Sequence, residues 1–395
     1  MNIALITEKT FPPVNRANLR LYRLAKVLVK KNHKVYFISP SIHPFSDTKF
    51  NYEGIKICQF KGFDKFLYSK LRAIVRGLHL FNSVAFIVSL NFKYQFDALH
   101  AWNPLAGLSA ILAGKIIKKP VYIDFTDFYS DIAKSDSNKL VTNFFSKIEN
   151  FILKNAEKIM VVSKPMKERL INQNIKESKI KIVEDGVDKN MFNPNLNGTK
   201  IRKKLGLRKN IPIIIYHGDI KPPDGVDILF KAFKVILREI PQTKLLIVGG
   251  GGTYFEKIKM LGKKLKIDKS IIYTGWIDHK EVPLYLVASD IGAMPMRPTL
   301  NHQCYLSFKL FEYWACGKPI ITTKLKAISA IVKNGKNGLI VEPENYLHLA
   351  KAFIYLLKRP NLAKKLGKNG RKLIEEKFNW DQLMEKEVQF CYSSK

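Results

Sequence analysis

The apolar residues of the chain fall into short runs that Gly, Pro or Asp residues bound. Six runs lie before residue 190 and six lie after residue 210. They are 3–7, 34–39, 98–102, 121–125, 159–163 and 180–183, then 212–216, 244–248, 270–273, 291–294, 319–322 and 338–341. Apolar runs of this length are typical of parallel strands that are buried on both faces.

Amphipathic stretches with helical spacing separate these runs. The clearest spans 225–240, and its apolar residues form one stripe along a helix: Val226, Leu229, Phe230, Phe233, Ile236, Leu237 and Ile240. Strands that alternate with helices give doubly wound parallel sheets. The pattern occurs twice, so the sequence predicts two Rossmann-like α/β domains.

The length of 395 residues also favours two domains over one core. Residues 188–198 are rich in Asn, Pro and Gly, which are turn formers. We therefore place the first domain at 1–193 and the second at 194–378. A cleft between two such domains is a favoured ligand site.

The charge of the chain is strongly positive, because 67 Lys and Arg residues face 33 Asp and Glu residues. An anionic partner would explain it: a membrane surface, a phosphorylated substrate or a nucleic acid. A compositional bias would also explain it, because Lys, Asn and Ile are abundant together. No nucleic-acid motif accompanies the charge, so we expect no nucleic-acid partner.

The four cysteines form no CxxC pair and no Cys/His cluster, so we expect no metal site and a reducing, cytoplasmic location. Residues 1–7 read as a charge-free strand, and no signal peptide is indicated. Residues 60–96 mix basic and apolar side chains, but the apolar stretch 78–92 contains Asn82 and is shorter than the ~20 residues of a membrane span. This segment is either a helix on an anionic membrane surface, at the inner face of the cell membrane, or a core helix with a solvated basic face.

The most informative motif is the stretch 307–323. It predicts a short helix with Lys309 and Glu312, ended by Gly317 and followed by a buried strand. Helix N-termini at such joints offer unpaired N–H groups to phosphates, and a carboxylate one turn inside can accept hydrogen bonds from sugar hydroxyls. An ordinary joint with a solvated Glu312 is the alternative.

Glycines that follow predicted strands suggest close approach of a ligand to the backbone. Gly218 follows one strand, and four glycines in a row, 249–252, follow the next. Without side chains, backbone N–H groups can approach a phosphate or a base. Turns alone need some of these glycines, but four in a row exceed that need.

Taken in order, these pieces resemble the retaining family-4 glycosyltransferases of GT-B architecture, over nearly the whole chain. The segments that carry the resemblance are 216–229, 245–251, 273–277, 288–291, 309–312 and 335–343. The resemblance implies a nucleotide-sugar donor, no metal and no cofactor. It also implies retention by front-side attack, in which the donor phosphate accepts the acceptor's proton. A final helix, 379–395, would return to the first domain.

The resemblance implies roles for particular residues of the second domain. Glu312 would hold the ribose hydroxyls, Lys309 would neutralise the diphosphate, and Gly275 with Trp276 would meet the nucleobase. A core position is the alternative for Trp276. The implied donor-binding set is Gly218, Asp219, Lys221, Gly249, Gly250, Gly251, Gly275, Trp276, Arg297, Ser307, Lys309 and Glu312.

The chain departs from the family pattern at three positions. Asp219 and Asp224 stand where members commonly have Arg and Lys for the leaving diphosphate, and Cys304 replaces the first of two paired glutamates. Because the transition state needs positive charge or N–H donors there, another group must supply it. The candidates are Arg297, Lys309, Lys221 and the N-terminus of the helix with Glu312.

The acceptor side is expected in the first domain. Asp127 follows a predicted strand and is the candidate for acceptor activation; a helix N-cap is its alternative role. The implied acceptor-side residues are Asn15, Arg16, His100, Trp102, Asn103 and Asp185.

The sequence thus predicts a glycosyltransferase that moves a hexose-like sugar to an acceptor hydroxyl. A surface glycan or a lipid-linked saccharide is the expected acceptor. One rival is a catalytically impaired GT-B-fold protein that binds a nucleotide or sugar. A second is a basic adaptor for membranes or nucleic acid.

Overall fold

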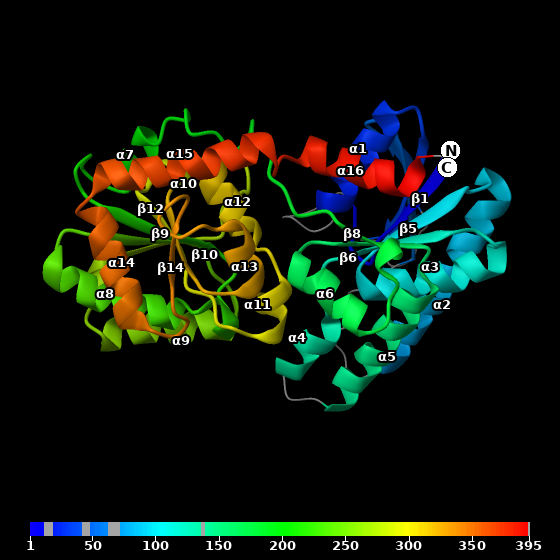
Figure 1. Ribbon diagram of the computed structural model, residues 1–395, viewed down its shortest axis with the longest axis horizontal. Helices are drawn as coiled ribbons and strands as arrows, with labels where there is room; N and C mark the ends of the chain where they lie inside the picture. Colours follow the sequence, from blue (N-terminus) through cyan, green and yellow to red (C-terminus); the bar gives the residue numbers. More distant parts are fainter. Residues whose placement is uncertain (12–18, 42–47, 62–71, 136–138, 394–395) are drawn as a thin grey trace. The chain divides into compact units, whose positions relative to one another are not determined.

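The computed structural model describes residues 1–11, 19–41, 48–61, 72–135 and 139–393. The chain divides into two compact units, each built around a sheet with helices on both faces (Figure 1). Unit 1 is Met1–Glu184 with Trp380–Lys395, and unit 2 is Asp185–Asn379. The predicted fold class, two Rossmann-like α/β domains, is confirmed.

Unit 1 contains an eight-stranded sheet in the order β3-β4-β2-β1-β5-β6-β7-β8. Every neighbouring pair is parallel except β3 and β4. The strands are β1 (Asn2–Ile6), β2 (Lys34–Pro40), β3 (Thr48–Tyr52), β4 (Ile55–Phe60), β5 (Ala98–Trp102), β6 (Val121–Phe125), β7 (Lys158–Val161) and β8 (Ile180–Ile182).

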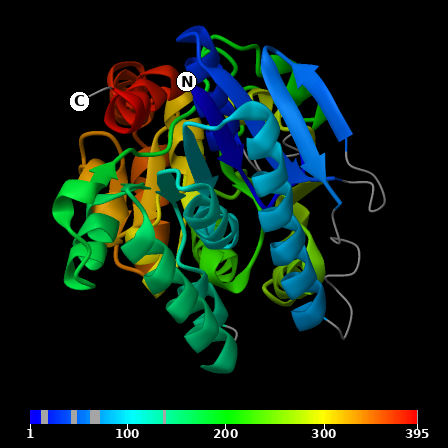
Figure 2. The ribbon, with the colours of Figure 1, turned by 90° about the vertical axis from the view of Figure 1, so that its right-hand side faces the viewer.

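The helices of unit 1 include the last one of the chain, which packs beside the first (Figure 2). They are α1 (Leu19–Lys30), α2 (Arg72–Tyr94), α3 (Asn103–Ile117), α4 (Tyr129–Ser135), α5 (Lys139–Asn155), α6 (Lys164–Asn172) and α16 (Trp380–Tyr392).

The hairpin of β3 and β4 is absent from the sequence prediction. Its turn consists of Glu53 and Gly54, which both have positive φ, 47° and 78°. Two left-handed residues match the twist of a tight hairpin. Strand β3 is largely exposed at the sheet edge, so it shows no apolar run that could reveal it.

Unit 2 contains a parallel six-stranded sheet in the order β11-β10-β9-β12-β13-β14. Its strands are β9 (Ile213–Gly218), β10 (Lys244–Gly249), β11 (Ile271–Gly275), β12 (Ile291–Met294), β13 (Ile320–Thr323) and β14 (Leu339–Val341). Side chains that alternate along β9 enter the two cores on opposite faces: Ile213 and Ile215 in one, Ile214 in the other.

Helices cover both faces of this sheet (Figure 1). They are α7 (Thr199–Lys204), α8 (Val226–Glu239), α9 (Gly252–Lys264), α10 (Val282–Ala288), α11 (Leu300–Cys304), α12 (Phe308–Ala315), α13 (Lys326–Ile331), α14 (Tyr346–Leu357) and α15 (Pro360–Glu376). All residues of α12 from Lys309 to Ala315 are buried, which is unusual for a helix that carries two charges.

Residues 185–193, assigned to the first domain from the sequence, group with unit 2. The reason is packing, because Val187 and Phe192 lie in a core of that unit. Of the basic-apolar segment 60–96, residues 62–71 lie outside the described residues, as do the side chains of 72–79. Within the described part of the chain, no helix combines the length and apolarity that crossing a bilayer requires.

The strand orders locate where each sheet favours a ligand. In unit 1 the order of connection reverses between β1 and β5, and in unit 2 between β9 and β12. At such a point the loops leave in opposite directions and open a crevice at the carboxyl ends of the strands. The residues that follow these four strands are therefore the candidates for binding a ligand.

Candidate functional site

Glycines end β9 and the neighbouring strand β10, so the backbone there carries no side chains. Gly218 ends this strand with a φ of 108°, which favours glycine. A Cβ atom there would lie 2.8 Å from Cε of Lys309. A Cβ on Gly249, at the end of the neighbouring β10, would lie 2.4 Å from the carbonyl oxygen of Gly218. Close approach of the Gly218 backbone therefore requires glycine at 249, and the backbone angle favours glycine at 218, which is partly exposed.

Helix α12 brings Lys309 to this point. The Nζ atom of Lys309 donates to the hydroxyl of Tyr216 at 2.9 Å and to Oδ1 of Asp224 at 3.0 Å. Lys309 is only 8% exposed, so its ammonium group has exchanged most of its water for these two partners. Burial, followed by the charge of Asp224, raises the pKa of Tyr216 well above its ordinary value, which keeps that hydroxyl protonated.

Glu312 lies one turn further along α12, on the same face as Lys309. It is 3% exposed, so the alternative of a solvated surface charge is wrong. Its Oε2 atom lies 2.6 Å from Nε2 of His217, and its Oε1 atom lies 2.9 Å from Nε2 of His279. Since an ionised carboxylate only accepts, each imidazole presents an Nε2–H group to it.

Neither histidine figured in the sequence analysis. His217 precedes Gly218 at the end of β9, and His279 comes from the loop after β11, where its ring contacts Phe192. Position at a strand end was a usable signal for His217. For His279 no local pattern pointed to the carboxylate of Glu312, which is 33 residues away.

The other cations proposed for the phosphate already have carboxylate partners. Arg297 lies 2.7 Å from Asp227 and 3.3 Å from Glu344, and it also donates to the carbonyl oxygen of Pro222. Burial acts to raise the pKa of Asp227, but the hydrogen bond and the charge of Arg297, with smaller contributions from the backbone and Lys231, together lower that pKa. At the surface, Lys221 pairs with Asp219 at 3.0 Å. Lys309 is thus the buried cation beside Gly218.

The remaining predicted donor residues lie around the same edge of the sheet. Gly250 and Gly251 continue the loop after β10, and Gly275 ends β11. Trp276 follows it and is 59% exposed, so it is not a core residue. Ser307 is buried directly before α12, and Cys304 is buried at the end of α11.

In unit 1 a polar cluster lies at the carboxyl ends of β1, β5 and β6. Asn103 has a left-handed φ of 66°, and its Oδ1 atom accepts from the backbone N–H and the hydroxyl of Thr126 at 3.1 and 2.8 Å. The Thr126 hydroxyl also lies 3.2 Å from Oδ2 of Asp127. The Tyr129 hydroxyl donates to Oε1 of Glu8 at 2.5 Å. The sequence analysis named Asn103 and Asp127 but missed Glu8 and Tyr129.

His100 was expected to contact an acceptor, but its side chain has no exposed surface and cannot do so in this structure. The hydroxyl of Tyr392 lies 2.8 Å from its Nδ1 atom, and Oε1 of Glu387 lies 3.3 Å from its Nε2 atom. Burial, and then the charge of Arg20, lower the pKa of His100 to about 3, so the imidazole is neutral.

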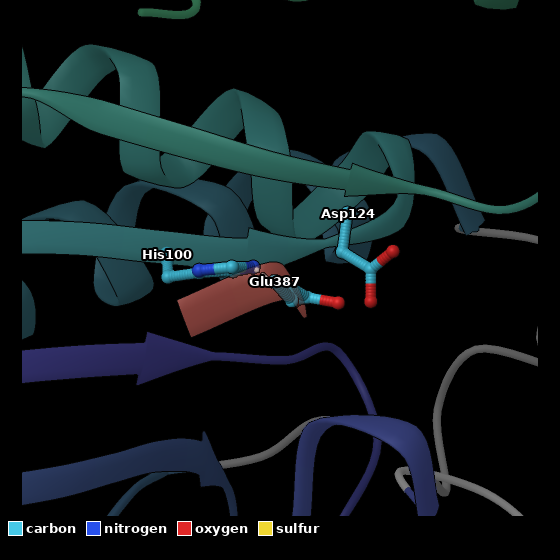
Figure 3. Close-up of side chains that lie close together, drawn as sticks. All are labelled: His100, Asp124 and Glu387. Carbon is cyan, nitrogen blue, oxygen red and sulfur yellow. Dashed lines mark ion pairs between the residues drawn. The ribbon is translucent and has the colours of Figure 1, made fainter. Parts of the chain in front are cut away.

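Among the described residues, His100, Asp124 and Glu387 lie close enough together to be considered as ligands of one metal ion (Figure 3). Arg20 already binds both carboxylates, through Nε to Asp124 at 2.5 Å and through an Nη atom to Glu387 at 2.9 Å. A fixed guanidinium charge repels a second cation nearby. We interpret the cluster as a buried ion-pair network that attaches α16 to α1 and β6.

Of the other acceptor-side residues, Trp102 is partly exposed at the end of β5. Asp185 is 2% exposed and belongs to unit 2. Asn15 and Arg16 lie outside the described residues.

Comparison with known proteins covers both units. Residues 17–190 match the family model described as Glycosyltransferase Family 4, and residues 197–373 match the one described as Glycosyl transferases group 1.

Two curated relatives and one solved structure extend this comparison over most of the chain. The N-acetyl-α-D-glucosaminyl L-malate synthase of Bacillus anthracis is 24% identical over 389 residues, 95% of this chain and 93% of that protein. The α-monoglucosyldiacylglycerol synthase of Streptococcus pneumoniae is 24% identical over 363 residues, 88% of this chain and 76% of that protein. HepE of Anabaena, solved in complex with UDP and glucose, aligns over 100% of both chains with a TM-score of 0.77 and 18% identity.

Proposed function

Because this chain belongs to the group 1 and family 4 glycosyltransferases of GT-B fold, we propose that it transfers a hexose-like sugar from a nucleotide-sugar donor to an acceptor hydroxyl. We further propose that the transfer retains the configuration of the sugar and needs neither a metal nor another cofactor. The observation that carries the proposal is the placement of Gly218, Lys309 and Glu312 at the point where the strand order of unit 2 reverses.

In this proposal the donor binds to unit 2. Its diphosphate meets the backbone around Gly218 and the N-terminus of α12, where unpaired N–H groups favour an anion. Its ribose approaches Glu312, and its base approaches Gly275 and the exposed Trp276. HepE, which was solved with UDP and glucose, supports a uridine nucleotide as the first donor to test.

Lys309 is proposed to supply the positive charge that the family pattern places elsewhere. Asp224 occupies a position where the family commonly has Lys, and the Nζ atom of Lys309 pairs with this very carboxylate. The cation therefore reaches the same neighbourhood from α12 instead of from the loop after β9. A diphosphate beside Gly218 would share Lys309 with Asp224, and the charge-assisted bonds would strengthen as the leaving group gains charge.

The acceptor is proposed to approach unit 1 at the polar cluster of Asn103, Thr126 and Asp127. Asp127 is half-buried, and it is our candidate for orienting the acceptor hydroxyl. In retaining front-side attack the donor phosphate accepts the proton, so Asp127 need only position the hydroxyl. The lipid in the name of the S. pneumoniae relative supports a lipid-linked acceptor, with a surface glycan as the other choice. We propose the inner face of the cell membrane as the place of transfer.

A second candidate function is a nucleotide- or sugar-binding protein that has lost catalysis. The observation in its favour is that Arg297, Lys221 and Lys309 all have carboxylate partners. Such a protein would bind a donor without releasing its sugar.

One experiment separates these possibilities. Nucleotide sugars are screened by thermal shift, because a donor that binds the native state raises its melting temperature. Each stabilising donor is then incubated with the protein, with water or an added glycoside as acceptor. The nucleoside diphosphate that is released is measured as turnover. Stabilisation with turnover supports the transferase; stabilisation without turnover favours the binding protein. A chain that no nucleotide sugar stabilises would contradict both.

A further inference from the structure

Helices α4 and α5 of unit 1 expose a combination of large apolar and basic side chains. Leu140, Phe144 and Lys147 follow one another at helical spacing and share one face of α5. Leu140 is 83% exposed and Phe144 is 56% exposed. Ile132 on α4, which packs against α5, is 43% exposed. We name the exposed apolar side chains and lysines of these two helices the hairpin surface: Ile132, Lys134, Lys139, Leu140, Phe144 and Lys147.

The acidic residues that the structure describes on these two helices point inward. Asp131 is buried and accepts two hydrogen bonds from Arg169 of α6. Glu149 is 3% exposed and accepts from the backbone N–H and the hydroxyl of Ser130 at 3.0 and 2.6 Å. Asp136, between the helices, lies outside the described residues. The charges that α4 and α5 present to solvent in their described part are therefore lysines.

The interior of the hairpin is well fixed, so the exposed apolar residues do not result from loose packing. The guanidinium group of Arg169 lies 3.6 Å from the ring centroid of Phe128, and the ring of Phe145 meets that of Tyr129 at 5.6 Å. Two adjacent residues of α5 thus differ in burial: Phe145 is buried and Phe144 is exposed. An exposed aromatic residue on a rigid helix is available to a partner at little ordering cost.

The first helix of the hairpin begins next to the proposed acceptor site. Strand β6 ends at Phe125, Asp127 follows, and α4 begins at Tyr129. Helix α4 therefore starts at the carboxyl edge of the sheet, and α5 runs back to the amino edge, where β7 begins at Lys158. In Figure 1 the two helices form the lower end of unit 1.

We propose that the hairpin surface docks unit 1 on an anionic lipid bilayer. The lysines would lie among the headgroups, while Leu140 and Phe144 would enter the interface between headgroups and acyl chains. Basic charge beside exposed aromatic and aliphatic side chains is the combination that interfacial binding uses. The absence of an outward carboxylate from the described part of the hairpin fits anionic headgroups. The docking proposal rests on the proposed function, which includes a lipid-linked acceptor, and adds to it the surface that reaches the bilayer.

The test is flotation of the full chain with phosphatidylcholine vesicles that contain about 30 mol% phosphatidylglycerol, at low and at high salt. We expect the native chain to float with these vesicles at low salt and to bind much less to phosphatidylcholine alone. Replacing Lys134, Lys139 and Lys147 by Gln should weaken binding about a hundredfold, because each lysine near an anionic leaflet contributes roughly fivefold. Leu140→Ser with Phe144→Ser should weaken it at least about tenfold.

A matched control comes from the end of α3 in the same unit. Ile116 is 61% exposed between the exposed Lys115 and Lys118, so this spot has a similar composition outside the hairpin surface, although Lys115 lies over the ring of Phe151 further along α5. Ile116→Ser with Lys115→Gln and Lys118→Gln should leave vesicle binding unchanged. Equal losses from the control and from the hairpin variants would mean that general charge governs binding and would overturn the proposal.

A second measurement does not depend on loss of binding. All four cysteines are buried, so Leu140→Cys provides a selective site for an environment-sensitive fluorophore. We expect a blue shift of its emission on addition of anionic vesicles; an unchanged spectrum would overturn the proposal. So would failure of the native chain to float at low salt, or a change from a dimer to a monomer on Leu140→Ser, which would mark a protein interface. Thermal stabilisation by UDP, measured on the same variants, tests the proposed donor function separately.

Discussion

Replacing Glu312 by glutamine probes the histidine cluster most directly. The carboxylate accepts from His217 at 2.6 Å and from His279 at 2.9 Å while only 3% exposed. Hydrogen bonds to a charged group contribute about 1.5–3 kcal/mol each, and neutral ones about 0.5–1.5 kcal/mol. Glutamine also offers one oxygen only, so one histidine must change tautomer to accept from the amide. We therefore expect Glu312→Gln to lower the free energy of unfolding by about 2 kcal/mol.

The assay is thermal unfolding of the full chain, followed with and without UDP. For a unit of this size, a loss of about 2 kcal/mol corresponds to a melting temperature lower by roughly 4–8 °C. The matched control is Glu344→Gln, because that carboxylate is largely exposed and its loss should shift melting by about 1 °C or less. In a His279→Ala background, Glu312→Gln should cost less, since the remaining amide oxygen can serve His217 alone.

The result that would refute this reasoning is a Glu312→Gln chain that melts with the native protein. It would mean that the two imidazoles do not depend on the carboxylate. Loss of UDP stabilisation without any change in the unliganded melting temperature would instead assign Glu312 to the donor alone.

Three further predictions follow from the site. Lys309→Met should weaken UDP binding about tenfold in a titration, whereas Lys221→Met, which removes an exposed cation, should change it less than about twofold; the reverse order would contradict the assignment of Lys309. Gly249→Ala should lower the melting temperature far more than Gly252→Ala: the first Cβ would meet the Gly218 carbonyl oxygen at 2.4 Å, while the second meets nothing within 4 Å, and equal effects would contradict the model of close approach. The pKa of Asp227 is lowered by Arg297 against the effect of burial, so this carboxylate contributes stability above its unfolded pKa of about 4 and loses it as the pH falls through the lower folded value. Asp227→Asn should therefore flatten the fall in melting temperature below about pH 4. An unchanged slope would speak against this pair.

Central strands such as β9 and β10 were predictable because each carries an uninterrupted apolar run. Ile213–Ile215 and Leu245–Ile247, for example, are fully buried and occur where the pattern placed them. The edge strand β3 was not predictable, since an exposed strand has no apolar signature and takes its structure from pairing with β4. A buried strand can be recognised in the sequence by its apolar residues, whereas an exposed strand that forms only through backbone pairing cannot.

Individual site residues could be predicted better than their partners. Glu312 and Lys309 were found from a helix placed between glycines and a buried strand. The His279 contact and the pairing of Lys309 with Asp224 join residues 33 and 85 positions apart, and only the folded sheet decides which loops meet. His100 was misread for the same reason, because its partners Glu387 and Tyr392 come from the last helix of the chain.

That last helix has a consequence for the synthesis of the protein. Unit 1 contains Met1–Glu184, but Glu387, which binds Arg20 in its core, is synthesised only after the whole of unit 2. From Glu184 to Glu387 a ribosome needs roughly 10–40 s at typical rates of elongation. During this interval unit 1 has all eight strands but lacks the carboxylate and the apolar face that cover Arg20 and His100. Unit 2, which is continuous in sequence, can complete its fold first, so the N-terminal half of the protein is the half that finishes folding last.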